Sequence, residues 1–183
     1  LVPLRVKWFG LATALLGRDE ELLELVHRSG CRGLLIGFES VTEAGLADCN
    51  KRFHRPNEYG ELLRRLHALG IAVNGTFVFG ADSDTLDSFD RTRDFVLEHR
   101  IGLPRFTVLT PFPGTPLYRR LEAEGRITSR DWSQYDGQHV VFYVDFEICL
   151  LEPRSCHLNG KLFVIFLDVH CRVAPRVECI LVE

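Results

Sequence analysis

The sequence predicts an α/β protein in which a parallel sheet is wrapped by helices. Two observations indicate this fold. Strand-like and helix-like segments alternate along the first 142 residues, and the expected strands begin near residues 5, 33, 71 and 105. Their spacing of 28 to 38 residues is the length of one strand and the helix after it, and such units form parallel sheets.

The first unit is a strand over residues 4–14 followed by a helix over 18–30. Acidic residues lead this helix, basic residues close it, and Gly30 supplies a left-handed stop. Its expected buried face consists of apolar residues at helical spacing: Leu22, Leu25 and Val26.

The second strand is expected over residues 31–40, a continuous apolar run typical of a strand covered on both faces. Ser40 and Glu43 have the spacing of a capping box and are expected to open the next helix. Strand and helix therefore follow each other without a long loop.

The third and fourth units repeat this order. Asn57 is expected to cap a helix that ends at Gly70, and Asp84 with Asp87 to start another. Residues 71–80 and 105–112 are the strands that follow. The predicted buried residues are Leu62, Leu63, Leu66 and Leu69 in the first helix and Leu86, Phe89, Thr92 and Val96 in the second.

Composition limits the classes of function. The 183 residues are 46% hydrophobic, enough for one domain core, and the formal net charge of −3 gives no basic surplus typical of nucleic-acid binding. No apolar run approaches the roughly 20 residues of a membrane span, and the start lacks a signal-peptide pattern. We expect a soluble, cytoplasmic protein that binds a small molecule, with no nucleic acid and no membrane span.

The composition changes near Tyr143. Four of the six cysteines follow it, without the paired C-x2-C spacing of structural zinc sites, so we predict no metal ligands: Cys149, Cys156, Cys171 and Cys179. We divide the chain into residues 1–142 and a divergent, β-prone tail, 143–183, expected to be frameshifted or disordered. A leucine at the start and the lack of Met indicate a piece of a longer protein.

Unusual residues follow the predicted strands. Glu39 ends the second strand, Gly80 closes the third, and Thr110 to Pro116 follow the fourth. Ligands of parallel sheets bind at these strand ends. A carboxylate there can accept hydrogen bonds from sugar hydroxyls or fix a cation, and the alternative is that Glu39 only caps structure or pairs with a nearby arginine.

The stretch "FTVLTPFPGTPLY" contains three prolines, at positions 111, 113 and 116. Because proline fixes the backbone, this loop is expected to be pre-organised, with carbonyls available to the edge of a planar ligand. The alternative is a rigid turn that directs the chain into the next helix.

Together with that stretch, "GCRGLLIGFESV", "NKRF", "GIAVNGTFVFGAD" and "DWSQYDGQHVVF" resemble, in order and spacing, the carboxyl-terminal part of the barrel of radical S-adenosylmethionine enzymes. The resemblance covers residues 4–142. It is nearest to the branch that often carries a cobalamin-binding domain. It implies a partial (β/α) barrel of TIM type with parallel strands.

The resemblance also implies roles for particular residues. Glu39, with Ser40, is expected to bind the ribose hydroxyls of S-adenosylmethionine. Lys51, with Arg52 and Arg55 behind it, is expected to receive the methionyl carboxylate, unless it is a solvated surface lysine. The residues expected to flank the adenine, some of which could instead be core, are Phe77, Val78, Phe79, Gly80, Thr110 and Pro111.

The family's chemistry uses a [4Fe-4S] cluster on three cysteines, usually C-x3-C-x2-C, and this chain has no such spacing. Cys31 and Cys49 are expected to be small apolar residues. The implied cofactors are S-adenosylmethionine, a cluster whose ligands lie outside this chain, and possibly cobalamin on another domain.

The implied function is S-adenosylmethionine binding within an enzyme that generates a 5′-deoxyadenosyl radical, with this piece alone inactive and the substrate unknown. Two alternatives stay open. The chain could be a noncatalytic remnant that binds a nucleotide or protein. It could also be an unrelated barrel enzyme that uses Glu39 as a base with Lys51.

Overall fold

The computed structural model describes residues 1–144. Four strands alternate with helices along this part of the chain. The strands are β1 (Trp8–Thr13), β2 (Cys31–Glu39), β3 (Ala72–Phe79) and β4 (Leu103–Val108). The helices are α1 (Glu20–Arg28), α2 (Glu43–Asp48), α3 (Pro56–Ala68), α4 (Leu86–Glu98) and α5 (Pro116–Ala123), with short 3₁₀ turns η1 (Val2–Leu4), η2 (Ala14–Arg18) and η3 (Trp132–Gln134).

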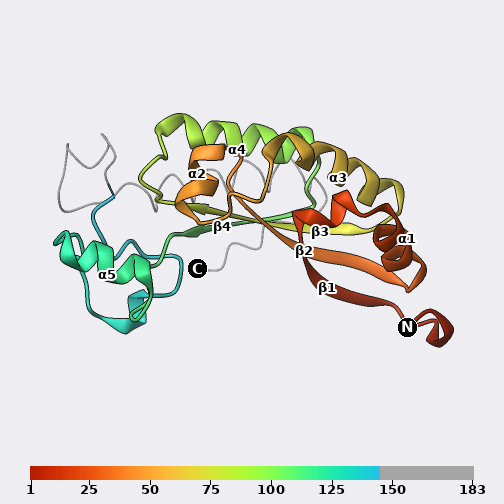
Figure 1. The fold of residues 1–183 in the computed structure, drawn as a ribbon, viewed down its shortest axis with the longest axis horizontal. Coiled ribbons are helices and arrows are strands. Elements are labelled where there is room, and N and C mark those ends of the chain that lie inside the picture. Colours follow the sequence, from red (N-terminus) through yellow and green to blue (C-terminus); the bar gives the residue numbers. More distant parts are fainter. Residues whose placement is uncertain (145–183) are drawn as a thin grey trace, which may run out of the picture.

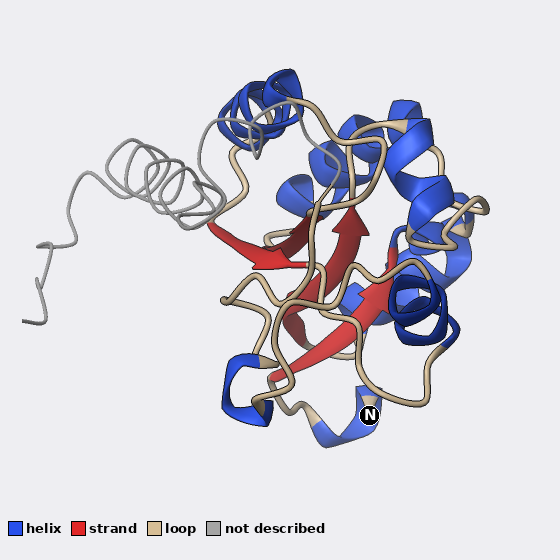
Figure 2. Ribbon diagram, turned by 90° about the vertical axis from the view of Figure 1, so that its left-hand side faces the viewer, coloured by secondary structure: helices blue, strands red, loops and turns tan. Residues whose placement is uncertain are grey.

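The strands form one sheet in the order β1-β2-β3-β4, and every neighbouring pair is parallel. The predicted α/β fold with parallel strands is therefore confirmed. Figure 1 shows α3 and α4 lying over the sheet, and the view in Figure 2 shows the large helices beside the strands. Each of β1, β2 and β3 is followed by one or two helices that return the chain to the amino end of the next strand, as the spacing in the sequence predicted.

The core lies between the sheet and these helices. Phe38 on β2 is fully buried, stacks on Phe77 of β3 at 5.6 Å between ring centroids, and meets Tyr59 of α3 edge-on at 4.8 Å. Phe79 stacks on Phe89 of α4 at 4.5 Å. This aromatic cluster joins two strands to two helices and makes one continuous core.

The opposite side of the sheet carries no described helix or strand, and we call it the open face. Strand alternation and the register of the pairs assign its residues. They are Phe9, Leu11 and Thr13 on β1, Gly33, Leu35 and Gly37 on β2, Ala72, Asn74, Thr76 and Val78 on β3, and Leu103, Arg105 and Thr107 on β4.

Two predicted helix starts were wrong. The N-cap of α2 is Thr42, whose hydroxyl accepts from Gly45 N–H at 3.1 Å, so Glu43 is the first helical residue rather than the partner of Ser40 in a capping box. At α3 the N-cap is Arg55, because Pro56 already supplies the helical φ at the first position, and Asn57 is the second helical residue.

The start of α4 also differs from the prediction. Its capping box joins Thr85 and Ser88, whereas Asp84 turns back to the loop before the helix. Leu86, expected in the buried stripe, is 47% exposed, but Phe89, Thr92 and Val96 are buried as predicted.

The buried face of α1 was predicted only in part: Val26 packs against the core, but two of the three expected residues do not. Leu23 is buried, whereas Leu22 and Leu25 are 44% and 51% exposed. The prediction for α3 was better, since three of its four leucines are fully buried and Leu69 is partly buried. Gly30, after α1, and Gly70, after α3, have positive φ as predicted.

The predicted boundary near Tyr143 falls at the edge of the described residues, and the predictions for the tail, including those for its cysteines, lie outside them. Within residues 1–144, no helix has both the length and the apolar character of a membrane span.

Candidate functional site

Glu39 is placed by an irregular end of β2. Its φ of 64° is in the left-handed region, and the register with β3 shifts between Gly37 and Glu39. The side chain folds back so that Oε1 occupies the space where a Cβ on Gly37 would lie. Because Gly37 is on the open face, the Glu39 carboxylate is held above that face at the carboxyl end of the strand.

Lys51 reaches this carboxylate from the turn after α2. Asn50 takes the left-handed conformation at φ 55°, and the Lys51 N–H donates to Leu46 O at 2.7 Å, which is the hydrogen bond of a Schellman motif. Lys51 therefore lies beyond the helix rather than in it. Its Nζ is 3.8 Å from Glu39 Oε1, with the two side chains 35% and 18% exposed.

Burial acts on the pKa of the carboxyl group in this pair. Removal from water raises the pKa of Glu39, and the charge of Lys51 opposes that shift. The neighbouring Cys49 thiol has its pKa raised to about 11 by burial and by nearby carboxylates including Glu39, so it stays protonated. The carboxylate is thus only partly neutralised by protein groups and can accept further hydrogen bonds.

Ser40, the second residue expected at the ribose, is buried in the turn. Its Oγ accepts from Thr42 N–H at 3.1 Å and lies 3.2 Å from the Thr42 hydroxyl. The hydroxyl holds the turn together directly after Glu39.

The β3 residues divide between the two faces of the sheet. Val78 lies on the open face, whereas Phe77 and Phe79 are 1% and 2% exposed in the aromatic core on the helix side. The side chains of Phe77 and Phe79 are therefore core residues, the alternative expected for some of this group, because alternation along the strand turns them away from the open face.

The loop after β4 is held by its own hydrogen bonds. Thr110 Oγ1 donates to Val108 O at 3.0 Å, and Thr110 O accepts from Phe112 N–H at 3.0 Å. Pro111 is buried, and Thr115 caps α5. These contacts make the loop a rigid turn into α5, which is the simpler of the two roles expected for it. The loop starts beside β3, because Leu109 N–H donates to Phe79 O at 2.8 Å.

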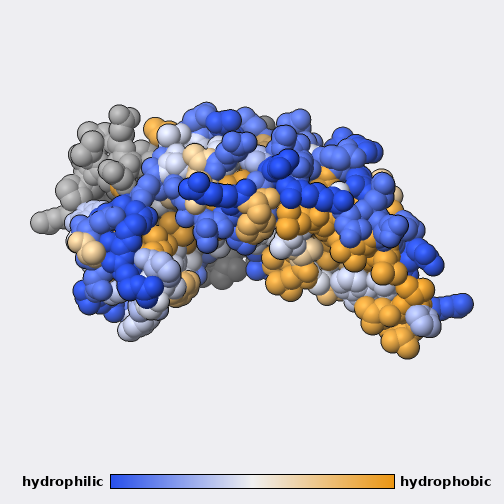
Figure 3. Space-filling model, viewed as in Figure 1, coloured by the Kyte–Doolittle hydropathy of each residue, from blue (hydrophilic) through white to orange (hydrophobic). Residues whose placement is uncertain are grey.

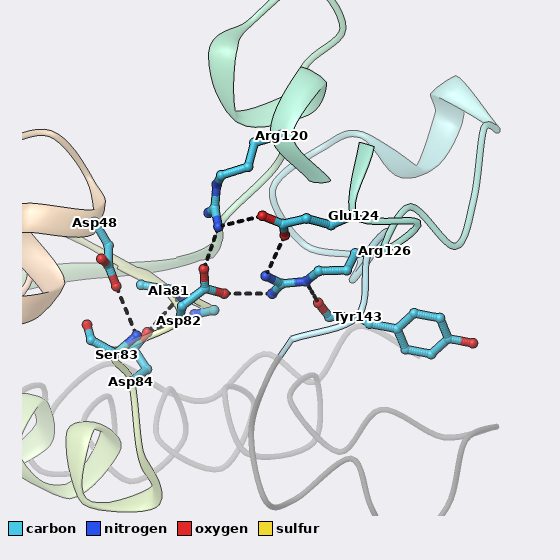
Figure 4. A network of polar contacts seen from close by, with 10 residues as sticks. Asp48, Ala81, Asp82, Ser83, Asp84, Arg120, Glu124, Arg126 and Tyr143 are labelled. Atoms are coloured by element: carbon cyan, nitrogen blue, oxygen red, sulfur yellow. Dashed lines mark hydrogen bonds and ion pairs between the residues drawn. The ribbon is translucent and has the colours of Figure 1, made fainter. Parts of the chain in front are cut away.

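A polar network fixes the loop between β3 and α4 (Figure 4). Asp84, 6% exposed, accepts from the N–H groups of Gly80 and Ala81 at 2.9 and 3.0 Å, which shapes the turn after β3. Asp82 binds Arg120 of α5 at 2.8 Å and Arg126 at 2.6 Å. The network therefore ties the carboxyl end of β3 to α5.

We expect Asp82→Asn to destabilise the chain by about 1 kcal/mol at pH 7, because a carboxylate shared by two guanidinium groups is replaced by a neutral amide. The hydrogen bond from Arg126 is the main cause that lowers the pKa of Asp82. The contribution should therefore be present above the ordinary pKa of 3.8 and be lost as the pH falls through the lowered value. Urea unfolding at pH 7 and pH 3 measures it.

The matched control is Asp90→Asn, since that carboxylate is 62% exposed on α4 and should contribute almost nothing. Equal effects of the two substitutions at pH 7 would show that the Asp82 network adds no stability.

Sequence reasoning missed two residues of the open face, Thr76 and Arg105. Both are assigned by alternation and register: Thr76 pairs with Gly37 on one side and Arg105 on the other. Counting every second residue back from Val78 would have found Thr76. Asp84 was expected at a helix start, and its role in the loop had no separate signal.

No family model matches the chain. It is 39% identical over 142 residues to bacteriochlorophyllide d C-12(1)-methyltransferase and 31% identical over 128 residues to bacteriochlorophyllide d C-8(2)-methyltransferase, both of Chlorobaculum tepidum. The alignments cover 78% and 69% of this chain.

A solved structure has the same fold. The radical S-adenosylmethionine methyltransferase TsrM from Kitasatospora setae, with cobalamin and a [4Fe-4S] cluster bound, matches 65% of this chain with a TM-score of 0.59 and 19% identity. This likeness supports the fold, and the methyltransferases above supply the relationship in sequence. The chain belongs to the radical S-adenosylmethionine enzyme family.

The chain spans about a third of the length of its curated radical S-adenosylmethionine relatives: 31% of the first and 28% of the second. It also corresponds to 23% of the TsrM chain.

The described residues do not fit the family's cluster. Cys31 is fully buried, with its Sγ 3.5 Å from Gly33 O and its pKa raised by burial, as expected of a core residue. Residues 1–144 contain no group of three His, Cys, Asp or Glu side chains that could hold a metal. The open face does fit a nucleoside, since it offers a partly buried carboxylate above a glycine at the edge where ligands of parallel sheets bind.

Proposed function

We propose that this chain is the S-adenosylmethionine-binding part of a radical S-adenosylmethionine methyltransferase. One observation carries the proposal: the Glu39 carboxylate is held above the open face, beside the ammonium group of Lys51. The names of the relatives support methyl transfer as the activity of the whole protein.

The roles of the residues follow from their chemistry. A carboxylate has two oxygens, so Glu39 can accept from both ribose hydroxyls at once. Lys51, whose side chain is 35% exposed, can donate to the methionyl carboxylate. Val78 offers an apolar surface on the same face to the adenine, and Gly80 and Thr110 follow the strands at that edge.

The chain's contribution is to bind and orient the cofactor. The electron needed for radical chemistry is supplied by an iron–sulfur cluster when one is bound, and its ligands belong to a part of the protein outside the described residues. Cobalamin is included as a cofactor of the whole protein because the TsrM structure contains it.

The alternative of an unrelated barrel enzyme is excluded by the family assignment. The alternative of a noncatalytic remnant that binds a nucleotide or a protein differs from the proposal in the activity of the whole protein. Formation of 5′-deoxyadenosine by the longer protein, after addition of a reductant, separates the two.

Binding is tested by calorimetric titration of S-adenosylmethionine into the 183-residue chain. Adenosine should compete with S-adenosylmethionine, and 2′,3′-dideoxyadenosine should compete at least about tenfold more weakly because it lacks both hydroxyls. Equal competition by the two nucleosides, or no S-adenosylmethionine binding by the folded chain, would contradict the proposal.

A further inference from the structure

The connection between β2 and β3 contains a polar cavity with a volume of about 480 Å³. Its walls come from α2, the turn after α2 and the first residues of α3. They include Glu43, Leu46, Arg52, His54, Arg55 and Asn57. Figure 3 shows mainly hydrophilic residues over the helices, whereas apolar residues gather over β1 and the N-terminal turn. The cavity therefore belongs to the helical connection and includes no residue of the open face.

The helix α3 begins at this cavity without a side-chain cap. Its N-cap residue is Arg55, whose side chain has no acceptor, and Pro56 at the first helical position has no N–H. The N–H of Asn57 has no described acceptor. This N–H lies at the positive end of the dipole of a helix of 13 residues. A backbone donor and a positive field at one place favour an anion.

The charged side chains of the cavity are mainly positive. Arg52 is exposed and has no ion pair or side-chain hydrogen bond among the described residues. Arg55 is 3.8 Å from Glu58, and its side chain is 69% exposed, so that this pair neutralises it only weakly. Glu43 is the carboxylate of the cavity wall. Lys51, in the same turn, binds Glu39 instead and stays outside the cavity wall.

His54 gives an observation that does not depend on the helix. It is 4% exposed, and its Nδ1 is 3.2 Å from the Tyr59 hydroxyl. Because that hydroxyl donates its proton to Phe38 O at 3.2 Å, it accepts from His54, and Nδ1 carries the proton of the neutral ring. The other ring nitrogen, Nε2, is buried and has no hydrogen-bond partner among the described residues. Buried polar atoms normally have a partner, so Nε2 indicates a ligand that shares a proton with it.

A phosphate monoester has the chemistry that these groups require. Its oxygens accept hydrogen bonds from guanidinium groups and from the N–H groups of a helix N-terminus. Its second pKa is about 6, so at neutral pH it readily shares one proton with a histidine nitrogen. A carboxylate, with an ordinary pKa of about 4, has less affinity for that proton.

We propose that the cavity between α2 and α3 binds the phosphate group of inorganic phosphate or of a small phosphate monoester. Arg52 and the Asn57 N–H donate to the phosphate oxygens, and one proton is shared between a phosphate oxygen and His54 Nε2. Glu39 and Lys51 take no part in this site, so it is independent of the proposed function.

Phosphate binding should take up a proton at pH 7.5. Burial and then the charge of Lys51 lower the pKa of His54, the hydrogen bond to Phe38 O opposes this shift, and Arg18 adds to it. Tyr59 stays protonated because burial raises its pKa. The free chain therefore has a neutral His54 ring, and the bound state holds about one proton more than its separate components. Affinity should fall as the pH rises from about 6.5 to 8.5.

The test is calorimetric titration of phenyl phosphate and phenyl sulfate into the 183-residue chain at pH 7.5, in two buffers with different heats of ionisation. We expect phenyl phosphate to bind about tenfold more tightly than phenyl sulfate, which carries one charge and no proton to share, and to take up about one proton. Inorganic phosphate identifies the source of the group. Equal affinity indicates free phosphate, and affinity at least about tenfold lower indicates an ester.

Two substitutions separate the contacts. His54→Asn keeps an N–H donor for Tyr59 at the position of Nδ1 but lacks Nε2, so it should bind phenyl phosphate about tenfold more weakly and take up no proton. Arg52→Gln should bind about tenfold more weakly but still take up the proton. Arg28→Gln is the matched control, because Arg28 is an exposed arginine in the last turn of α1, and it should bind as the wild type does.

Several outcomes would overturn the phosphate site. They are no binding of phenyl phosphate by the folded wild type, binding without proton uptake, and unchanged affinity in Arg52→Gln. Circular dichroism checks that His54→Asn is folded, and Arg52→Gln decides the test if it is not. S-adenosylmethionine should bind equally with and without saturating phenyl phosphate. Competition between the two ligands would overturn a separate phosphate site.

Discussion

Glu39→Gln is expected to weaken S-adenosylmethionine binding by about tenfold to a hundredfold, as measured by calorimetry. A hydrogen bond to a charged group contributes about 1.5–3 kcal/mol, and the amide offers one acceptor oxygen where the carboxylate offers two. The substitution keeps the shape of the side chain, so the open face should be otherwise unchanged. Glu61→Gln, on the exposed side of α3, is the control and should bind as the wild type does.

Stability separates a binding effect from unfolding. Because burial raises the pKa of Glu39 in the folded chain above its ordinary value of 4.5, the ionised carboxylate costs stability at neutral pH and nothing once the pH is below that value. Glu39→Gln should therefore be more stable than the wild type at pH 7, and this gain should disappear by about pH 4. Unchanged affinity in this more stable variant would remove Glu39 from the ribose site.

Phe77→Ala is expected to lower the free energy of unfolding by about 3–5 kcal/mol, the range for a large aromatic residue removed from a core. Phe77 is 1% exposed and touches the rings of Phe38, Phe95 and Phe106 at centroid distances of 5.6 to 6.2 Å. Its loss leaves a cavity among rings that join β2, β3, β4 and α4. Urea unfolding followed by circular dichroism measures the change.

The matched control is Val78→Ala, the next residue on β3, whose side chain lies on the open face. It should cost about 1 kcal/mol or less in stability and should affect S-adenosylmethionine binding more than unfolding. A larger loss of stability at Val78 than at Phe77 would mean that the faces of β3 are assigned the wrong way round.

The fold was predictable because the signals for it are local. The apolar run at 31–40, the glycines after α1 and α3, and the spacing of the units each depend on a few neighbouring residues, and the structure agrees with them. The helix caps were less predictable, since Ser40, Thr42 and Glu43 all suit a cap and only the path of the chain after β2 selects Thr42.

The location of the candidate site could be predicted from the sequence, but the directions of its side chains could not. A carboxylate after β2 had to lie at the edge where the other parallel strands end, but its fold back over Gly37 depends on a left-handed φ that glutamate seldom adopts. Likewise, Phe77 and Val78 look alike in an apolar run. Only pairing with β4 decides which of them turns toward the helices.

The two edges of the sheet, at β1 and at β4, differ in how easily a further strand could pair with them. At β4, Val108 N–H already donates to Gly137 O at 2.7 Å, so a newcomer on that side would have to displace this segment. At β1, the described residues pair only with β2, and the outward N–H and C=O groups are free of them. A fifth strand could therefore pair along the whole of Trp8–Thr13 without displacing a described residue, and the sheet would then grow on the β1 side.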